Sequence, residues 1–402
     1  MKEIFVTRYL EPEFTDSTFT FHPDCRYFTG DVPCKLRRPC THCDHYSPAG
    51  PRILIILLRR LGDVLLVSPL TRRLKREMPN AHITWLVQSD CARLVELNPL
   101  VDRVLIFDWQ ACIQLLSESY DLVLGFERIF AAAALVAQIQ SRRKFGLAYG
   151  SANNTLYPLD EAAQYFFKMN TWNDFRTHKN TKTWTELYFE VAGYEYAQED
   201  NVLELPEEVI EQAQTFLQQT GQGDIVCFNL GGSLATKLWP AAHWSALGKL
   251  LLEHGYRLLL LGGPAEAELY QTIVLQLEEE DPQSLLLPGT NCSIDLFLAY
   301  ISQSHFVVTG DTFGFHASLT FNKPTAVLFG PSTPAEVVPK HKRNVVVLRS
   351  SFPCSPCARH IFCGGVGGCM STISVGDVFA AVESLSEAIV DMDGGKKNER
   401  IF

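Results

Sequence analysis

Short apolar runs alternate with amphipathic segments along this chain, and they form two separate arrays. One array starts at residues 53–58 and the other at residues 225–230. Runs of this length that are apolar throughout and separated by helical segments are typical of parallel strands with both faces covered. The sequence therefore predicts an α/β fold in which two facing Rossmann-like domains follow a small cysteine-rich N-terminal extension.

The expected secondary structure follows the same strand–helix order in both arrays. In the first array we expect strands at 53–58, 82–87, 104–107 and 122–126, and helices at 63–78, 92–97 and 130–140. Residues 151–200 are aromatic and polar and indicate one clear helix, at 186–192, with a connection and a further helix within 199–220. In the second array we expect strands at 225–230, 257–261, 285–287, 306–308, 325–329 and 345–348, and helices at 241–253, 265–278, 294–302, 315–321 and 375–390.

The domain organisation follows from these arrays. At 402 residues the chain is long enough for two full-sized cores and a smaller appendage. We expect four units: a cysteine-rich extension (1–51), a first Rossmann-like domain (52–205), a second one (206–373) with a cysteine-rich loop (354–369), and a C-terminal helix with a tail (374–402).

The charge and hydropathy of the chain argue against two classes of partner. The formal net charge is −10, whereas nonspecific nucleic-acid binding needs a broad basic surface. The longest apolar stretches, 53–58 and 129–137, are too short to span a membrane, and the first residues do not form a signal peptide. We therefore expect a soluble, cytoplasmic protein that holds any anionic substrate with a local cluster of side chains.

Acidic residues follow two of the expected strands at the point where a helix begins. Asp63 lies in Leu61-Gly62-Asp63-Val64, and Asp311 opens the segment 311–316. Ligands of open α/β sheets bind outside the carboxyl ends of the strands, and a helix start offers backbone N–H groups to an anion. Two such edges in two domains predict a ligand-binding cleft between them.

The motifs at these edges resemble a known family. Arg59 to Leu70, followed by Pro79 to Val87, closely resembles the opening of the ADP-heptose:lipopolysaccharide heptosyltransferases, glycosyltransferase family 9. In the second half the resemblance continues, in order, through segments 229–232, 236–240, 261–266, 310–316 and 323–331. It covers about residues 52–390 and implies the GT-B fold, with the acceptor site in the first domain and the nucleotide-sugar site in the second.

The resemblance implies an inverting, metal-independent glycosyltransferase that needs no cofactor for catalysis. Its donor would be ADP-heptose or a related nucleotide sugar, and its acceptor a lipopolysaccharide, another glycan, a lipid-linked sugar or a protein side chain. One alternative is a non-catalytic scaffold whose cysteine clusters bind partners, but such a protein has no need of Asp63, Lys237 and Asp311 together. A sugar-nucleotide epimerase is disfavoured by the Leu-Gly-Asp motif.

Two residues are the candidates for catalysis. Asp63 would be the general base for the acceptor hydroxyl, although a helix-capping role alone would also explain an aspartate there. Lys237 would stabilise the departing diphosphate, with a solvated surface lysine as the alternative. Arg59 and Arg60 flank Asp63 and would grip an anionic donor or acceptor, and we expect one of the two to be a plain surface charge.

The residues expected around the donor lie in the second array. Asp311 would hydrogen-bond a ribose hydroxyl or cap its helix, and His316 would pack in the helix or contact the diphosphate. Many family members have a small residue where this chain has Phe313, and the glycine follows one place later. The full donor set is Gly231, Thr236, Asp311, Thr312, Phe313, Gly314 and His316.

Twelve cysteines are many for a cytoplasmic protein, and most fall in two clusters. A C-x2-C pair with two further cysteines indicates structural zinc or iron in a reducing compartment, with free thiols or disulfides as the alternative. The second cluster resembles a cysteine motif of some family 9 members, including autotransporter heptosyltransferases with a four-cysteine iron site. The clusters are Cys25, Cys34, Cys40 and Cys43, and Cys354, Cys357, Cys363 and Cys369.

Basic residues crowd the end of the first expected helix: Arg72, Arg73, Lys75 and Arg76. They would face an anionic membrane or a lipid-linked acceptor, giving a peripheral membrane contact. The alternative is that they complement the negative end of the helix dipole, and it is the stronger of the two.

Overall fold

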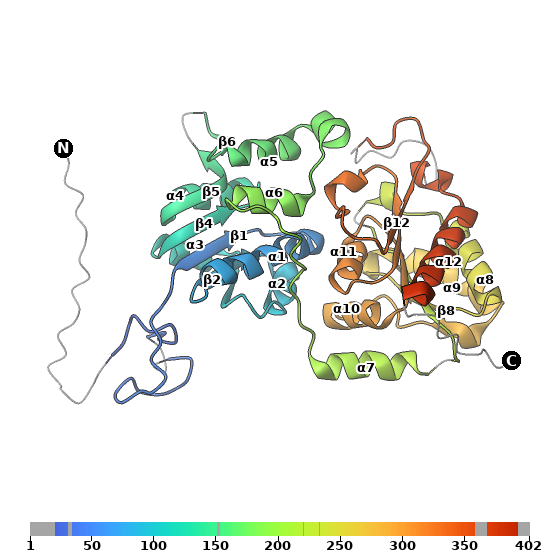
Figure 1. The fold of residues 1–402 in the computed structure, drawn as a ribbon, viewed down its shortest axis with the longest axis horizontal. Coiled ribbons are helices and arrows are strands. Elements are labelled where there is room, and N and C mark those ends of the chain that lie inside the picture. The colour runs from blue at the N-terminus through green and yellow to red at the C-terminus, as the bar shows by residue number, and fades with distance from the viewer. Residues whose placement is uncertain are drawn as a thin grey trace.

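The computed structural model of the chain describes residues 21–30, 34–150, 153–219, 221–232, 234–357 and 368–392. It contains two six-stranded sheets, one in each half of the chain, and helices pack around both (Figure 1). This is the predicted pair of Rossmann-like domains.

The first sheet has the strand order β3-β2-β1-β4-β5-β6. Neighbouring strands are parallel except β5 and β6, which are antiparallel. The central strand β1 is almost wholly apolar and buried because helices cover both faces. The strands are β1 (Arg52–Ile56), β2 (His82–Val87), β3 (Arg103–Ile106), β4 (Ser119–Gly125), β5 (Gln140–Gly150) and β6 (Thr155–Pro158). The helices of this half are α1 (Leu61–Glu77), α2 (Ser89–Glu96), α3 (Trp109–Leu116), α4 (Phe130–Gln138), α5 (Ala162–Thr171), the π-helical turn η1 (Phe175–Lys179) and α6 (Trp184–Val191).

The second sheet repeats this arrangement with the order β12-β11-β10-β7-β8-β9, and all its pairs are parallel. Its strands are β7 (Ile225–Asn229), β8 (Arg257–Leu261), β9 (Leu285–Leu286), β10 (Phe306–Gly310), β11 (Thr325–Phe329) and β12 (Val345–Arg349). Its helices are α7 (Glu207–Leu217), α8 (Ala241–Glu253), α9 (Ala267–Glu278), α10 (Ile294–Gln303), α11 (Phe313–Thr320) and α12 (Val375–Met392). Short 3-10 turns are η2 (Ala235–Lys237), η3 (Pro264–Glu266), η4 (Pro282–Ser284), η5 (Pro334–Glu336) and η6 (Gly368–Thr372).

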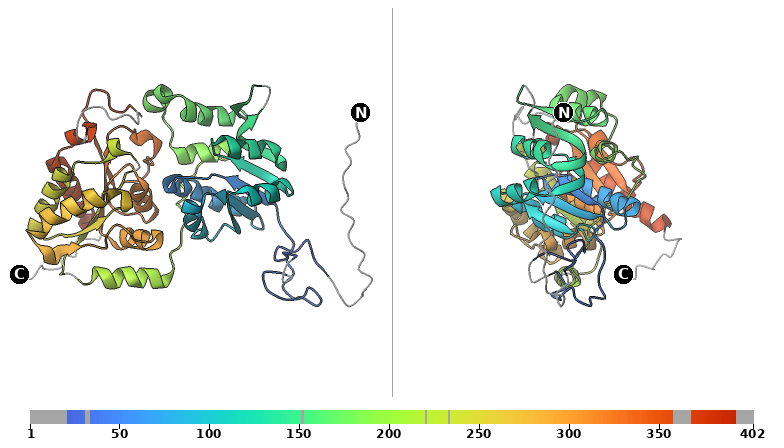
Figure 2. Two further views of the ribbon diagram at one scale, coloured as in Figure 1. Left: turned by 180° about the vertical axis from the view of Figure 1, so that it is seen from behind. Right: turned by 90° about the vertical axis from the view of Figure 1, so that its left-hand side faces the viewer.

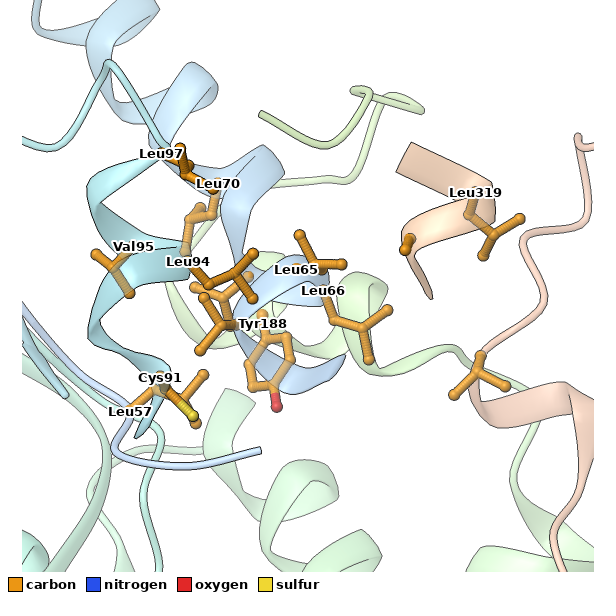
Figure 3. Close-up of a cluster of buried hydrophobic side chains, with 14 of the residues drawn as sticks. Leu57, Leu65, Leu66, Leu70, Cys91, Leu94, Val95, Leu97, Tyr188 and Leu319 are labelled. Carbon is orange, nitrogen blue, oxygen red and sulfur yellow. The ribbon is translucent and has the colours of Figure 1, made fainter. Parts of the chain in front are cut away.

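The two halves meet through α1 and α11, which lie next to each other between the sheets (Figure 1). Figure 3 shows Leu65 and Leu66 of α1 between the side chains of α2 and Leu319 of α11, and all three leucines belong to one cluster of buried apolar residues. At the start of α1, a Cβ on Gly62 would lie 2.6 Å from Cδ2 of His316. Gly62 therefore allows the close approach of the two domains.

Several expectations about secondary structure are wrong in detail. The helix expected to reach residue 140 ends at Gln138, because the chain turns into β5 there. Strand β5 was missed because its first half carries Arg142, Arg143 and Lys144, which interrupt the apolar pattern. The helices α3 and α5 were missed as well. The C-terminal helix α12 is no separate unit, because Val378, Val382 and other residues join the apolar core of the second sheet.

The described part of the N-terminal extension, residues 21–30 and 34–50, contains two isolated β-bridges but no helix or longer strand. Figure 2 shows it beside the first domain, on the side away from the second. Arg26 pairs with Asp102 at 3.4 Å, and Lys35 donates to the Asp102 backbone carbonyl at 3.4 Å. These contacts attach the extension to the β2–β3 region.

The basic end of α1 does not form a free patch. Lys75 pairs with Asp102 at 2.6 Å, and Arg73 and Arg76 pair with Glu199 at 2.7 and 3.2 Å. Arg72 is exposed, but the ion pairs of the other three residues favour the structural alternative over a membrane-facing cluster. Among the described residues, every helix is too short or too polar to cross a bilayer.

Candidate functional site

A cavity of about 130 Å³ lies between the two domains, at the carboxyl ends of β1, β4 and β11. Most of its wall comes from the first domain, and the second contributes the loops after β7 and β11. The lining residues are Leu57, Arg59, Arg60, Asp63, Phe126, Glu127, Arg128, Phe166, Asn170, Arg176, Trp184, Tyr188, Leu234, Lys237, Pro331 and Ser332.

Asp63 is the third residue of α1 and faces this cavity. The N-cap position belongs to Arg60, and no side chain caps α1 there, so the capping role considered for Asp63 is wrong. Burial raises the pKa of Asp63 to about 6. The Arg60 and Arg176 guanidiniums oppose this rise, whereas the Glu127 and Asp311 carboxylates add to it. A carboxyl group with this pKa can exchange a proton near neutral pH.

The backbone just before Asp63 is held in an unusual conformation. Arg60 has a φ of 70°, which is uncommon for a residue with a side chain. Such conformations persist where the surroundings determine them, and they concentrate at functional sites. Arg59 and Arg60 are both exposed and both line the cavity, and the expectation that one of them is a plain surface charge stays a prediction.

Glu127 forms part of the cavity wall at the end of β4 and is buried. Its carboxylate accepts hydrogen bonds from the backbone N–H groups of Leu58 (3.2 Å), Arg128 (2.8 Å) and Ile129 (3.1 Å). Glu127 therefore ties the end of β1 to the end of β4, and it brings a second carboxylate near Asp63.

Lys237 and Asp311 form an ion pair in the second domain. Lys237 Nζ lies 2.6 Å from Asp311 Oδ2 and donates to the Asp311 backbone carbonyl at 3.0 Å. Burial opposes ionisation of Asp311, but Lys237 stabilises the carboxylate and lowers its pKa below the usual value. The N-cap of α11 is Thr312, so Asp311 does not cap this helix. Lys237 lines the cavity and is not a solvated surface lysine.

The backbone before α11 packs tightly against β7. Asn229 Nδ2 donates to Thr309 and Thr312, at 2.8 Å each. A Cβ on Gly314 would lie 2.3 Å from this Nδ2, so this position has no room for a side chain. Phe313 stacks on Phe297 with ring centroids 5.5 Å apart. The departure at Phe313 is thus accommodated by packing against α10.

His316 lies at the domain boundary, where its ring faces Gly62. Burial lowers the pKa of His316 to about 4, so its ring is neutral at pH 7. On the β7 side, Glu266 accepts hydrogen bonds from the N–H groups of Gly263 (2.9 Å) and Gly232 (3.4 Å) and fastens the loop that carries Gly231. Thr236 in the same loop is buried.

None of the seven residues expected around the donor is among the described residues that line the cavity. They lie on the second-domain side of it, around the β7 loop and the start of α11. The structure therefore brings Asp63 and Lys237 to one cavity and places the expected donor residues next to it.

The wall residues Glu127, Arg128, Arg176 and Tyr188 were missed from the sequence. Glu127 and Arg128 directly follow the strand expected at 122–126, so the strand-end rule applied to Asp63 could have found them. Arg176 gave no such signal, because it lies in a π-helical turn within the irregular segment 151–200.

The cysteine clusters are described only in part. Cys363 lies outside the described residues, whereas Cys354 is exposed and Cys369 is buried. The Cys357 N–H donates to the carbonyl of Pro331, which lines the main cavity, at 3.1 Å. In the N-terminal extension Cys25, Cys34, Cys40 and Cys43 line one small cavity. Within the described segments no group of three or more His, Cys, Asp or Glu side chains is arranged to hold a metal ion.

Two facing domains with parallel sheets and a cavity between their strand ends define the GT-B class of glycosyltransferase folds. The model of glycosyltransferase family 9 (heptosyltransferase) matches residues 109–361. The chain belongs to this family and is a glycosyltransferase. The family assignment sets aside the scaffold and epimerase alternatives.

Individual relatives agree with this assignment. Lipopolysaccharide heptosyltransferase 1 of Pseudomonas aeruginosa is 26% identical over 330 residues, which cover 77% of this chain and 86% of the relative. The solved ADP-heptose LPS heptosyltransferase II of E. coli has a TM-score of 0.64 at 19% identity and covers 84% of this chain and 99% of its own. The iron-containing dodecameric glycosyltransferase TibC from enterotoxigenic E. coli has a TM-score of 0.51 at 14% identity, and the match covers 85% of this chain and 80% of TibC. The structural likenesses show the fold.

Proposed function

We propose that this enzyme transfers a heptose from ADP-heptose to a sugar acceptor of the lipopolysaccharide type, with inversion at the anomeric carbon and without a catalytic metal. The family, and the activities named for its relatives in Pseudomonas aeruginosa and E. coli, support the sugar and the donor. The observation that carries the chemistry is a carboxyl group with a pKa of about 6, Asp63, in one cavity with Lys237.

Asp63 acts as the general base in this proposal. The acceptor oxygen attacks the anomeric carbon from the face opposite the diphosphate, and its proton passes to the Asp63 carboxylate. The bond between the anomeric carbon and the phosphate oxygen breaks, and ADP leaves with the electron pair. A single displacement of this kind inverts the anomeric configuration.

Lys237 stabilises the charge that develops on the diphosphate. Its ammonium group is held by Asp311, 2.6 Å away, which keeps it at the cavity wall. The diphosphate would share this ammonium group with Asp311 and take further hydrogen bonds from N–H groups of Thr312, Phe313 and Gly314. These groups supply the positive charge that a metal ion supplies in other glycosyltransferases, and Gly231, Thr236 and His316 complete the donor side.

The acceptor would bind in the first domain. A second cavity of about 280 Å³ shares Arg59, Arg128 and Asn170 with the main one and is otherwise mostly apolar. The two arginines suit an anionic group on the acceptor, and the apolar part suits the face of a sugar ring. Another glycan, a lipid-linked sugar and a protein side chain remain the alternative acceptors, and the cytoplasm remains the expected location.

The proposal includes structural zinc or iron at the cysteine clusters. The iron in TibC supports the C-terminal cluster, and the contact between Cys357 and Pro331 connects this loop to the cavity wall. In the N-terminal cluster the four thiols line one cavity but are not arranged around a common point, so a metal there would have to draw them together. The metal would hold loops in place and take no part in transfer.

The test is to incubate the full chain with a panel of nucleotide sugars and acceptors and to determine the product's anomeric configuration by NMR. We expect turnover with ADP-heptose, an inverted linkage, and unchanged rates in EDTA. Retention of configuration would contradict the single displacement. Turnover with another nucleotide sugar but not with ADP-heptose would overturn the donor.

A further inference from the structure

Two arginine–carboxylate pairs join the first domain directly to the second. Arg93 of α2 pairs with Asp295 of α10, with its Nη2 2.6 Å from Oδ2. Arg176 of η1 pairs with Glu336 of η5, with Nε and Nη2 both 2.7 Å from Oε2. The pairs differ in position, because Arg176 lines the main cavity and Arg93 does not.

The Glu336 carboxylate lies in an enclosed environment. Its side chain is 3% exposed, and the same Oε2 also accepts a hydrogen bond from Trp184 Nε1 at 3.1 Å. The Arg176 guanidinium lies over the Trp184 ring, 5.6 Å from its centroid. A buried carboxylate is strongly unfavourable without its partner, so Glu336 and Arg176 stabilise each other's position. We call this cluster of Glu336, Arg176 and Trp184 the clasp.

The clasp leaves one edge of Arg176 available. Nε and Nη2 point to Glu336, and Nη1 has no hydrogen-bond partner among the described residues. Arg176 sits in a π-helical turn, a distortion that is frequent at functional sites. A guanidinium held on one edge presents its other N–H groups in a fixed direction, which suits an anionic oxygen.

We propose that Glu336 is a positioning residue, which holds Arg176 from the opposite domain so that its free edge binds an anionic oxygen of the substrates when the domains are closed. This inference rests on the proposed function of the cavity. The oxygen belongs either to the donor diphosphate or to an acid group of the acceptor. Arg176 would then couple domain closure to the assembly of the site.

The electrostatic surroundings of Asp63 provide a readout for this role. Arg176 is one of the cations that lower its pKa, so release of Arg176 raises that pKa. Removal of the Glu336 charge by itself would lower the pKa of Asp63, because loss of a nearby negative charge favours ionisation of the Asp63 carboxyl group. The direction in which the pKa of Asp63 moves therefore distinguishes release of Arg176 from simple loss of the Glu336 charge. The charged and titratable groups around Asp63 are Arg59, Arg60, Cys91, Glu127, Arg128, Arg176, Tyr188, Lys237, Asp311 and His316.

The experiment compares full-length Glu336→Gln, Arg176→Gln and the double variant in steady-state kinetics across pH. We expect Glu336→Gln to lower kcat/KM roughly tenfold or more and to move the acidic limb of the profile upward by about 0.5 pH unit. The double variant should be no slower than Arg176→Gln, because Glu336 acts through Arg176. A selective rise in the KM for the donor assigns the oxygen to the diphosphate, and a rise for the acceptor assigns it there.

The matched control is the other interdomain pair. Arg93→Gln and Asp295→Asn should change kcat/KM less than about twofold and leave the acidic limb in place, because this pair is more exposed and lies outside the cavity. Equal effects at both pairs, or a limb that stays or moves downward in Glu336→Gln, would overturn the positioning role. Trp184→Phe removes one hydrogen bond to Glu336 and should produce a smaller upward shift.

The same assay separates this inference from the proposed function. A wild-type enzyme without heptosyl transfer, or without an acidic limb near pH 6, contradicts the proposed function. Normal transfer and a normal limb in wild type, with an unaltered Glu336→Gln variant, contradict the clasp alone.

Discussion

Each domain places an aspartate near the junction of a strand and a helix, and the surroundings give the two carboxyl groups different pKa values. Asp63 follows β1, is half-buried at the cavity wall, and has a pKa raised to about 6. Asp311 follows β10, is also shielded from solvent, and has a lowered pKa because Lys237 lies 2.6 Å away. Titratable groups whose environments separate their pKa values in this way commonly divide the acid–base and electrostatic roles of a site. The first domain thus offers a proton acceptor, and the second a fixed anion that holds a cation.

The largest expected effect comes from removing the carboxylate of the first domain. Asp63→Asn should lower kcat by about 10²–10⁴-fold, the usual contribution of a general base, while affinity for the donor stays near that of wild type. Single-turnover kinetics and calorimetry with ADP measure the two quantities. An unchanged turnover number would remove Asp63 from the chemistry.

The free energy of unfolding of an Asp63 variant distinguishes a buried general base from a helix cap. The folded-state pKa of Asp63 lies above its ordinary value of 3.8, so stability is lost as the pH rises from 3.8 to about 6 and the loss is constant at higher pH. Asp63→Ala should therefore increase the free energy of unfolding at pH 7.5 by about 1 kcal/mol, after allowance for partial exposure. Asp108 caps α3 through the Ala111 N–H at 2.7 Å, and Asp108→Ala should lose about 1 kcal/mol in the same urea titration. A similar loss in both variants would contradict the buried-base account.

The next largest effect on activity is expected from removing Lys237, the cation of the second domain. Lys237→Ala should weaken ADP binding and lower kcat/KM by about 10²-fold, because the charge of the diphosphate grows as it departs. Lys249 makes an exposed pair of the same length with Glu280, and Lys249→Ala is the matched control with an expected change below twofold. Wild-type affinity for ADP in Lys237→Ala would exclude Lys237 from the site.

The two glycines near these aspartates, Gly62 and Gly314, should respond differently to substitution by alanine. Gly314→Ala would press against Asn229, which two hydrogen bonds hold, and should reduce the free energy of unfolding by about 1–3 kcal/mol. Gly62→Ala would press against the His316 ring across the domain boundary, so it should impair domain closure more than stability. Addition of His316→Ala should restore domain closure to Gly62→Ala, measured by small-angle X-ray scattering, but leave Gly314→Ala unstable. Lack of any rescue would contradict the close approach of α1 and α11.

The smallest effect on catalysis is expected from removing metal. Chelation should leave kcat within about twofold, since the proposed mechanism has Asp63 and Lys237 act without a metal, while the cysteine loops loosen towards proteolysis. Elemental analysis of wild type, Cys354→Ser and Cys25→Ser assigns metal to each cluster. Protein that contains neither zinc nor iron, with all thiols titratable, would refute the metal sites.

Apolar and polar strands differ in how well the sequence predicts them. Strands β2, β8 and β11 were predicted with their observed bounds, because these buried parallel strands are mostly apolar. The polar strand β5 was missed for the opposite reason. Asp63 and Lys237 could be found from their positions at strand ends and from the family motifs, and the structure brings both to one cavity.

The pairing of these residues could not be predicted from the sequence. Lys237 and Asp311 are 74 positions apart, and Arg176 and Glu336 are 160 apart. Their contacts depend on how loops from different elements, and for the clasp from different domains, come together. Local periodicity describes single elements, so it carries no signal for such pairs.

The central claim is that Asp63 is the base whose environment sets the working pH of the enzyme. The most direct measurement is the pH dependence of kcat/KM for wild-type enzyme between about pH 4.5 and 9, which extends to both sides of this pKa. Because a base must be ionised, we predict that activity is present above pH 6 and falls tenfold per pH unit below an apparent pKa of about 6. A profile that stays flat down to about pH 4.5, or that rises on acidification, would contradict the account.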